Sequence, residues 1–574
     1  MHGQKACPWR LIFLFGIFLS MREKNKNEGS ECGDEAHNKP SILKALFSSQ
    51  YLTYLDVVES EGLGNLSSVV KDTFDAFAKC GSMTEGFAYL RCDTCEEFQV
   101  CGFSCKRRGF CPRCASRRGA SHEVHLMDNV FPEVDVRQWV MTYPPQIRYL
   151  MATNREAMSL VHRVSEHEIG LYYRRRGRQR LGIQGQTGSV SFIQMAGSAL
   201  NLAPHAHSLF VDGVFVENSN GIQIFHSLPP SPSDIEHVLS HICSKVFEAL
   251  QQRDLLEKYD SGEGYVYNIP DRLAPWNIND LCAAASIGYR SALGERKGKG
   301  LRKVGWAMRA GGDTSVSAEG GYLQNGFSIH CDRRVKGHQR DKLRKLVGYV
   351  SRPMVPESRL SWTEDGLVEL ELKRKWDDGT TAIQFDPLEM IEKLACLVPH
   401  RWKNLVIYSG CFAPNSGVRD EIVPDMEERR NTAGNRSWYI PWAELLAKTF
   451  GKDLFTCPNC DSRRRVLMLI THKELIGKIL ASLGISPDPP SLAYKMMGGQ
   501  RVPSSRYPVK LDYPVGEIIN APWLTTKVSD EIRRMVPLLK TRVEFLENFL
   551  KIYDCGEANK AIESDIIGLK QFEW

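Results

Sequence analysis

A His-x-His motif at the start of an apolar run is the sequence feature that most constrains the fold. His205 and His207 are separated by one residue and lead into Leu209, Phe210 and Val211, residue types suited to a strand in a buried sheet. Side chains two positions apart on a strand point to the same face, so both imidazoles would share one side of a sheet. Together they can hold one divalent ion, and imidazole ligands favour manganese or a similar metal over calcium. For the motif alone, two histidines on a solvated sheet face remain an alternative.

A second strand is expected immediately upstream. Residues 188–194 alternate in character, and the alternation breaks at Gly197. This pattern predicts a hairpin with the histidine strand. Gln194 then becomes a candidate third metal ligand, although a glutamine that faces solvent or caps the core fits the same position.

Residues 340–353 show the periodicity of an amphipathic helix. Its buried face is formed by Leu343, Leu346, Val347 and Val350. Tyr349 falls at the edge of this face, between Lys342 and Lys345, and Arg352 follows one turn later. A phenol has an ordinary pKa of about 10, so it becomes a nucleophile only where positive charge or a metal stabilises the phenolate. We therefore predict Tyr349 as a nucleophile assisted by Lys345 and Arg352, with Lys342 as a phosphate contact. The alternative is an amphipathic tyrosine at a helix edge.

Two Cys-x-x-Cys pairs near the N-terminus have the spacing of a four-cysteine zinc site. The predicted ligands, with fifteen residues between the pairs, are Cys92, Cys95, Cys111 and Cys114. Two such turns can supply four thiolates at tetrahedral angles. Cys101 and Cys105 lie inside the loop and would compete as ligands, and Cys80 lies just before it. The loop also carries the predicted DNA contacts Lys106, Arg107 and Arg108, so the zinc would hold a basic surface against a phosphate backbone.

A further pair, Cys457 and Cys460, is half of a second zinc site. It is followed by three arginines, residues 463–465. The sequence identifies no partner pair for it. His472 would complete a site only with a fourth ligand from elsewhere.

The composition fits an intracellular enzyme that acts on DNA. The 574 residues, of which 42% are hydrophobic, suffice for three or four compact units, and the 17 cysteines in apolar or metal-like settings suit a reducing compartment. The net charge is only +6, but Arg174, Arg175 and Arg176 directly follow Tyr172 and Tyr173. Positive charge beside flat rings is what a channel for single-stranded DNA needs. A solvated helix face would carry the same charge.

The N-terminal apolar segment, residues 11–19, resembles the core of a signal peptide. It is too short to span a bilayer, and no small-residue cleavage site follows it. The polar stretch from 22 to 40 is expected to be disordered. We therefore expect no export, no membrane partner, and a cytoplasmic, nucleoid-associated protein.

Several sequence blocks occur in a fixed order between residues 80 and 484. They are 103–114, 136–140, 197–202, 326–330, 348–353, 375–380, 410–415 and 457–460. In these blocks and in the His-x-His motif the chain resembles rolling-circle transposases of the IS91 type, which are HUH endonucleases. Founding members carry two tyrosines four residues apart, whereas the residue four positions before Tyr349 is Lys345. The chain is therefore similar to the single-tyrosine branch.

The resemblance implies a DNA transposase that cleaves and rejoins the single-stranded ends of an insertion element through a 5′-phosphotyrosine on Tyr349. It also implies structural Zn²⁺, catalytic Mg²⁺ or Mn²⁺ at His205 and His207, and the host replication machinery as a partner. The oligomeric state stays open. Two alternatives remain: an HUH replication initiator, and a non-catalytic zinc-ribbon protein that binds nucleic acid.

Five regions are predicted. They are a disordered or apolar extension (1–45), a transposase zinc-binding domain (46–130), an HUH tyrosine catalytic domain (131–356), an extension of that domain (357–445) and a C-terminal region with the second cysteine pair and a terminal helix (446–574). The expected fold class is α+β. An antiparallel HUH sheet should carry the histidines with helices on one face, preceded by the small zinc module and followed by an α/β C-terminal extension.

Overall fold

The computed structural model describes residues 17–19, 41–424 and 455–482, apart from residues 183, 222, 261–264, 276 and 306–321. The chain divides into two compact units. The first takes residues 1–49, 74–107 and 442–574, and the second takes residues 50–73 and 108–441. The first unit is thus assembled from segments on both sides of the second in the sequence. Most of the predicted N-terminal extension, and all of the predicted terminal helix, lie outside the described residues.

A seven-stranded sheet forms the centre of the second unit. Its strand order is β12-β13-β4-β6-β5-β18, and β14 also pairs with β4. The strands are β4 (Val136–Thr142), β5 (Gly188–Ala196), β6 (Leu202–Val211), β12 (Tyr322–Gln324), β13 (Phe327–His330), β14 (Arg334–Val335) and β18 (Val406–Gly410). Each of these pairings is antiparallel. The predicted hairpin is confirmed as β5 and β6, in which Gln194 lies directly opposite His205.

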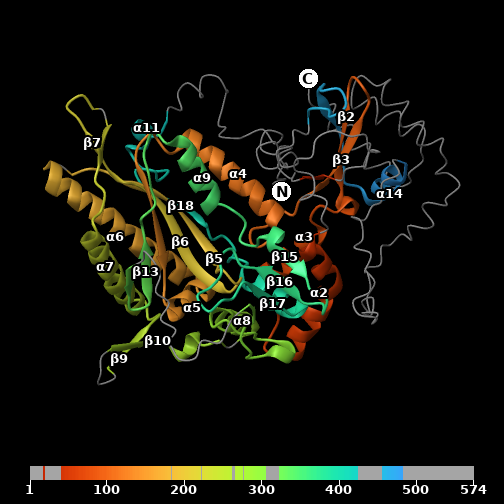
Figure 1. Cartoon of the computed structure of the whole chain (residues 1–574), viewed down its shortest axis with the longest axis horizontal. Coiled ribbons are helices and arrows are strands. Elements are labelled where there is room, and N and C mark those ends of the chain that lie inside the picture. Colours follow the sequence, from red (N-terminus) through yellow and green to blue (C-terminus); the bar gives the residue numbers. More distant parts are fainter. Residues whose placement is uncertain are drawn as a thin grey trace, which may run out of the picture. The chain divides into compact units, whose positions relative to one another are not determined.

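Helices cover both faces of this sheet. On one face α4 (Pro112–Asn129) packs beside α9 (Arg340–Val350), as Figure 1 shows, and both contribute to an apolar core that includes Leu209 of β6. On the other face lie α5 (Pro145–Thr153) and α6 (Arg155–Leu181). There Glu166 of α6 accepts hydrogen bonds from Ser189 of β5, at 2.5 Å, and from Ser208 of β6.

The mixed helical and antiparallel class is therefore confirmed, but the prediction that helices cover only one face is wrong. Seven of the nine residues of β5 are buried, so neither face of this strand is left to solvent. The serines that alternate with apolar residues on β5 suggest a wet face. Ser189 instead donates to the buried carboxylate of Glu166, and Ser191 donates to the hydroxyl of Ser208, pairings that the sequence pattern does not reveal.

The remaining elements of the second unit surround this core. They are β7 (Gly213–Glu217), β8 (Gln223–Ser227), α7 (Pro232–Gln251), β9 (Glu257–Asp260), β10 (Tyr265–Asn268), η2 (Asp271–Leu273), α8 (Ile278–Ile287), η3 (Gly294–Arg296), η4 (Glu357–Arg359), α10 (Pro387–Cys396) and α11 (Arg419–Ile422). A separate four-stranded sheet has the order β11 (Arg302–Val304), β17 (Ala382–Phe385), β16 (Val368–Glu371) and β15 (Leu360–Trp362). Helix α4, which falls within the predicted zinc-binding domain, lies in the unit with the histidines, and β18, which falls within the predicted extension, pairs with β5 of the central sheet. The predicted domain bounds stay predictions.

A four-stranded sheet forms the first unit. Its order is β1 (Ile17–Leu19), β3 (Phe98–Phe103), β2 (Phe87–Cys92) and β19 (Arg464–Ile470). Helix α14 (Lys473–Ser482) contacts η1 (Met83–Glu85) in the same unit. Helices α2 (Ile42–Ser60) and α3 (Ser68–Lys79) contribute residues to both units. In the part of the chain that the structure describes, no helix combines the length and apolarity needed to cross a membrane.

Candidate active site and metal centres

The structure brings the two histidines and the predicted tyrosine together. His205 and His207 project from the same face of β6, and their ring centroids are 5.0 Å apart. The ring of Tyr349, on α9, meets that of His207 edge to face with 6.3 Å between centroids. The three side chains come from a strand and a helix that are 142 residues apart, counted from His207 to Tyr349. They form one candidate site on the α9 face of the sheet.

Contacts with β5 and α4 fix the position of the tyrosine helix. The amide nitrogen of Gln194 donates a 2.8 Å hydrogen bond to the carbonyl of Val350, the last residue of α9. On the other side, Gly119 of α4 lies so close to Ser351 that the helices touch through backbone atoms. Gln194 therefore connects the histidine hairpin to the tyrosine helix. Its role as a third metal ligand stays a prediction.

Both histidines are held in the neutral form that binds metals. Burial, the nearby His205 ring and the cations Arg352 and Arg333 lower the pKa of His207 to about 3. Burial also lowers the pKa of His205. The Nδ1 of His205 lies 2.7 Å from the carbonyl of Ala203, which can only accept, so Nδ1 carries the proton and Nε2 keeps its lone pair. This donor set fits a divalent metal.

Gln138 of β4 is a site residue that the sequence analysis missed. Its amide nitrogen lies 2.8 Å from Nδ1 of His207, so in this orientation the amide donates and Nδ1 accepts. When the amide is rotated by 180°, its oxygen accepts from Nδ1–H instead, and Nε2 of His207 is left for a metal. The signal in the sequence was a glutamine directly before the apolar residues 139–141 of the strand. It lies two positions before Val140, and Val140 pairs with His207.

Three cations surround the Tyr349 ring. The distances to the ring centroid are 4.2 Å from Cζ of Arg352, 4.8 Å from Nζ of Lys373 and 5.5 Å from Cζ of Arg333. The predicted neighbour Arg352 is therefore placed at the site, whereas Lys342 and Lys345 are exposed on α9. Lys373 and Arg333 were not predicted, because each lies in a different segment from the helix and no periodicity links them to it.

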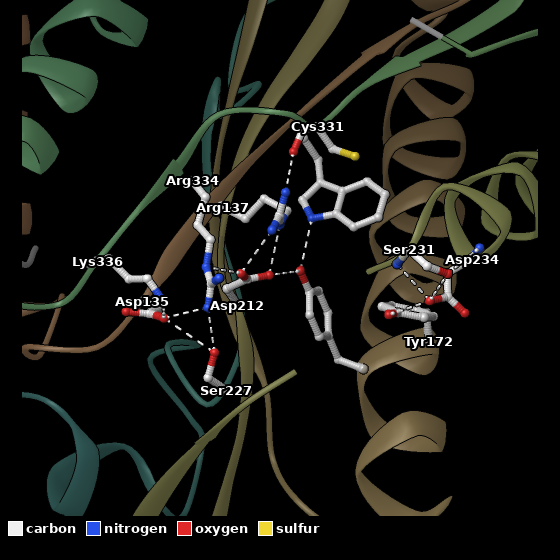
Figure 2. Close-up of polar contacts among 12 residues, drawn as sticks. Asp135, Arg137, Tyr172, Asp212, Ser227, Ser231, Asp234, Cys331, Arg334 and Lys336 are labelled. Carbon is white, nitrogen blue, oxygen red and sulfur yellow. Dashed lines mark hydrogen bonds and ion pairs between the residues drawn. The ribbon is translucent and has the colours of Figure 1, made fainter. Parts of the chain in front are cut away.

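A buried ionic network holds the segment that carries Arg333. Asp212, fully buried at the end of β6, accepts from Arg137 at 2.8 and 3.1 Å and pairs with Arg334 at 2.7 Å (Figure 2). Arg137 also donates a 2.7 Å hydrogen bond to the carbonyl of Cys331. Residues on both sides of Arg333 are thus anchored to β4 and β6. Its own carbonyl accepts from the backbone of Gln138 at 3.0 Å.

The basic and aromatic run on α6 is not arranged as the predicted DNA channel. Tyr173 is fully buried and donates to Asp212 at 2.9 Å, so it cannot stack on a base. Tyr172 donates to Asp234, which also pairs with Arg176 at 3.2 Å (Figure 2 shows the tyrosine and the carboxylate). Helix α6 covers the sheet face opposite the histidines. Arg174 and Arg175 on that helix therefore lie on the opposite side of the sheet from Tyr349.

The residues predicted to contact DNA in the cysteine-rich loop belong to different units. Arg107 is exposed and Lys106 partly buried in the first unit. Arg108, in the second unit, donates through its guanidinium to the carbonyl of Lys403, and burial lowers its pKa. A DNA contact through Lys106 or Arg107 stays a prediction.

The first cysteine pair has different partners from those predicted. Cys92 lies 3.4 Å from Cys460, and Cys95 lies 3.4 Å from Cys457, measured between sulfur atoms. All four sulfurs lie within 4.8 Å of one another. A structural zinc takes four ligands, so this group is complete without Cys111 and Cys114, and the predicted four-cysteine set is corrected. That set was predicted from cysteine spacing, which relates only pairs that lie near each other in the sequence.

Two family models match the chain. A putative transposase family matches residues 188–419, which include both histidines and Tyr349, and a transposase zinc-binding domain of the IS91 type matches residues 47–143. Together these regions cover more than half of the 574 residues. No curated protein and no solved structure shows significant similarity to the chain. Since a zinc-binding domain of the IS91 type is followed in the sequence by a transposase core, the chain belongs to the IS91 family of transposases.

Proposed function

We propose that this transposase nicks and rejoins single-stranded DNA through a covalent 5′-phosphotyrosine on Tyr349. The observation that carries the proposal is the contact between the rings of Tyr349 and His207, at a point where three cations also converge. A phenol, two neutral imidazoles and concentrated positive charge are the groups that phosphoryl transfer to a tyrosine requires.

In the proposed step, Oη of Tyr349 attacks the scissile phosphorus. The phenol gives its proton to water, a P–O bond to the tyrosine forms, and the bond to the 3′ oxygen breaks; this oxygen takes up a proton from water and leaves as a 3′-hydroxyl. Arg352, Lys373 and Arg333 stabilise the charge on the phosphoryl oxygens. Attack by a new 3′-hydroxyl reverses the step, so joining needs no nucleotide cofactor.

His205 and His207 would hold Mg²⁺ or Mn²⁺, with Gln194 as a weaker third ligand. When bound, such an ion polarises the scissile phosphate. Gln138 fixes the orientation of the His207 ring, and the carbonyl of Ala203 fixes that of His205. The strands to be cut would be the ends of the insertion element, and the host replication machinery would copy the transferred strand.

The match to a zinc-binding domain supports a structural role for zinc in this protein. Besides Cys92 and Cys95, the matched domain contains four further cysteines that are candidate ligands of structural zinc sites, namely Cys80, Cys105, Cys111 and Cys114. Such sites stabilise a small fold and do not take part in phosphoryl transfer.

The experiment is a covalent-adduct assay on oligonucleotides that contain the element ends. A 5′-phosphotyrosine retains the fragment on the 3′ side of the nick, so a 3′-labelled strand should give a labelled protein and a 5′-labelled strand a shorter free fragment. Tyr349→Phe should form no adduct while binding the same DNA. Tyr172→Phe, on the opposite face of the sheet, is the matched control and should retain the adduct.

Other outcomes assign other functions. An adduct in Tyr349→Phe would move the nucleophile to another tyrosine. Binding without any adduct in the unmodified protein would favour a non-catalytic zinc-ribbon protein. Nicking confined to a double-stranded origin would favour a replication initiator.

A further inference from the structure

The C-terminal cysteine pair lies against the N-terminal pair because of strand pairing. Strand β19 runs antiparallel to β2, and in this register Arg464 lies opposite Cys92. The turn that contains Cys457 and Cys460 precedes β19, and the turn that contains Cys95 follows β2. Two segments separated by 362 residues, from Cys95 to Cys457, therefore meet within the first unit.

The two turns share two backbone features. The amide of Cys92 donates to the carbonyl of Glu97 at 2.8 Å, and the amide of Cys457 donates to that of Ser462 at 2.9 Å, five residues on in each case. The residue after each second cysteine has a positive φ, 64° at Glu96 and 55° at Asp461. Two equivalent Cys-x-x-Cys turns facing each other are the arrangement in which four thiolates surround one zinc.

The sulfur distances fit zinc and do not fit disulfides. Thiolates at about 2.3 Å from a tetrahedral zinc lie about 3.8 Å from one another, and here the closest pairs are 3.4 Å apart with all four within 4.8 Å. A disulfide would need about 2.05 Å, and all four cysteines are free thiols.

We propose that Cys92, Cys95, Cys457 and Cys460 form one zinc site, which fastens the C-terminal segment to the N-terminal zinc-binding module. Two of its ligands lie outside the matched zinc-binding domain. The metal therefore joins Cys92 and Cys95 to Cys457 and Cys460, two parts of the first unit that are separated in the sequence by the second unit. The module depends on the C-terminal pair because half of a tetrahedral site binds zinc weakly.

The test is the zinc content of the full-length protein and its variants, measured by elemental analysis without DNA. Cys457→Ser/Cys460→Ser should lose one zinc per chain, and Cys92→Ser/Cys95→Ser should lose the same one. The variant with all four substitutions should lose no more than either pair. Unchanged zinc in the first variant, or additive losses in the combined one, would overturn the proposal.

Two further variants separate ligand loss from misfolding. Cys460→His restores a zinc-binding atom and should keep the zinc that Cys460→Ser loses. Cys243→Ser, at a buried cysteine of α7 outside either cysteine group, should keep the full content. Hydrogen exchange gives an independent measurement: peptides from β19 should lose protection in both double-serine variants, whereas peptides from α9 should not. Unchanged protection of β19 in a variant that has lost its zinc would contradict the fastening role.

Discussion

Replacing Gly119 by alanine should displace Tyr349, the proposed nucleophile, without touching it. Gly119 is buried in α4, and a Cβ atom at this position would lie 2.7 Å from the carbonyl oxygen of Ser351 and 3.4 Å from its carbon. Ser351 caps the C-terminus of α9, two residues after Tyr349. The clash is between the new Cβ, which is fixed to the backbone, and a backbone carbonyl, so no side-chain rotation relieves it. The end of α9 must move away from α4 by several tenths of an ångström.

The net cost follows from two opposing contributions. Alanine in place of glycine stabilises a helix interior by about 1 kcal/mol, whereas overpacking a filled contact costs about 1–3 kcal/mol. Gly170 of α6 offers a matched control, because a Cβ there meets its nearest neighbour at an ordinary 3.5 Å. Gly170→Ala should therefore be neutral or stabilising, and Gly119→Ala less stable than it by about 1–3 kcal/mol. For a unit of this size each kcal/mol shifts Tm by about 1–2 °C.

The larger effect should be on the rate of adduct formation. A misplacement of about 1 Å of a reacting group can cost about 100-fold in rate, so Gly119→Ala should slow the reaction at least 10-fold while DNA binding persists. The assay is the single-turnover rate of adduct formation, run beside thermal unfolding of both variants. Adduct formation at the unmodified rate in Gly119→Ala, with an unchanged Tm, would refute the reasoning that this contact positions Tyr349.

Two other predictions concern the histidines. Gln138→Leu removes the partner of His207 Nδ1 and should weaken the apparent affinity for Mn²⁺ by about 10–100-fold with the rate at saturating metal largely retained; an unchanged Mn²⁺ titration would contradict this role. The pKa of His207 is about 3 in the folded protein, against about 6.5 in the unfolded chain. The folded state therefore binds fewer protons between these values, and stability should fall as the pH decreases from about 6.5 towards 3. His207→Gln should reduce this slope in urea unfolding measured at pH 5 and pH 7, and an identical slope would show that other groups cause it.

The sequence predicts best where a local period is tied to burial. The apolar stripe of α9, the hairpin of β5 and β6, and the shared face of the two histidines all follow from periods of 3.6 and 2 residues. Contacts between distant segments could not be predicted in this way, since no short-range pattern encodes them. The partner of Cys92 is 368 residues away at Cys460, and only the pairing of β19 with β2 reveals it.

Burial on the second face of the sheet was also hidden from the sequence. The run Arg174–Arg176 beside Tyr172 and Tyr173 has the composition of a nucleic-acid channel. However, Tyr173 packs in the core and Tyr172 lies partly buried beside it. Tyr173 donates to the buried Asp212, and Tyr172 donates to a carboxylate that also pairs with Arg176. A charge run alone does not show whether its neighbours are paired, because the acidic partner Asp234 belongs to another helix, α7.

The segments that build the candidate site extend well beyond the tyrosine helix. Lys373 reaches the Tyr349 ring from the segment that follows β16, and β18 hydrogen-bonds along β5, the strand that carries Gln194. Without β18, the edge of β5 would expose unpaired backbone groups next to the hairpin that positions both histidines. A cation proposed to stabilise phosphoryl charge and a strand that completes the sheet thus both come from residues after 356. The part of the chain predicted as an extension of the catalytic domain therefore supplies part of the candidate site and part of the sheet on which that site is built.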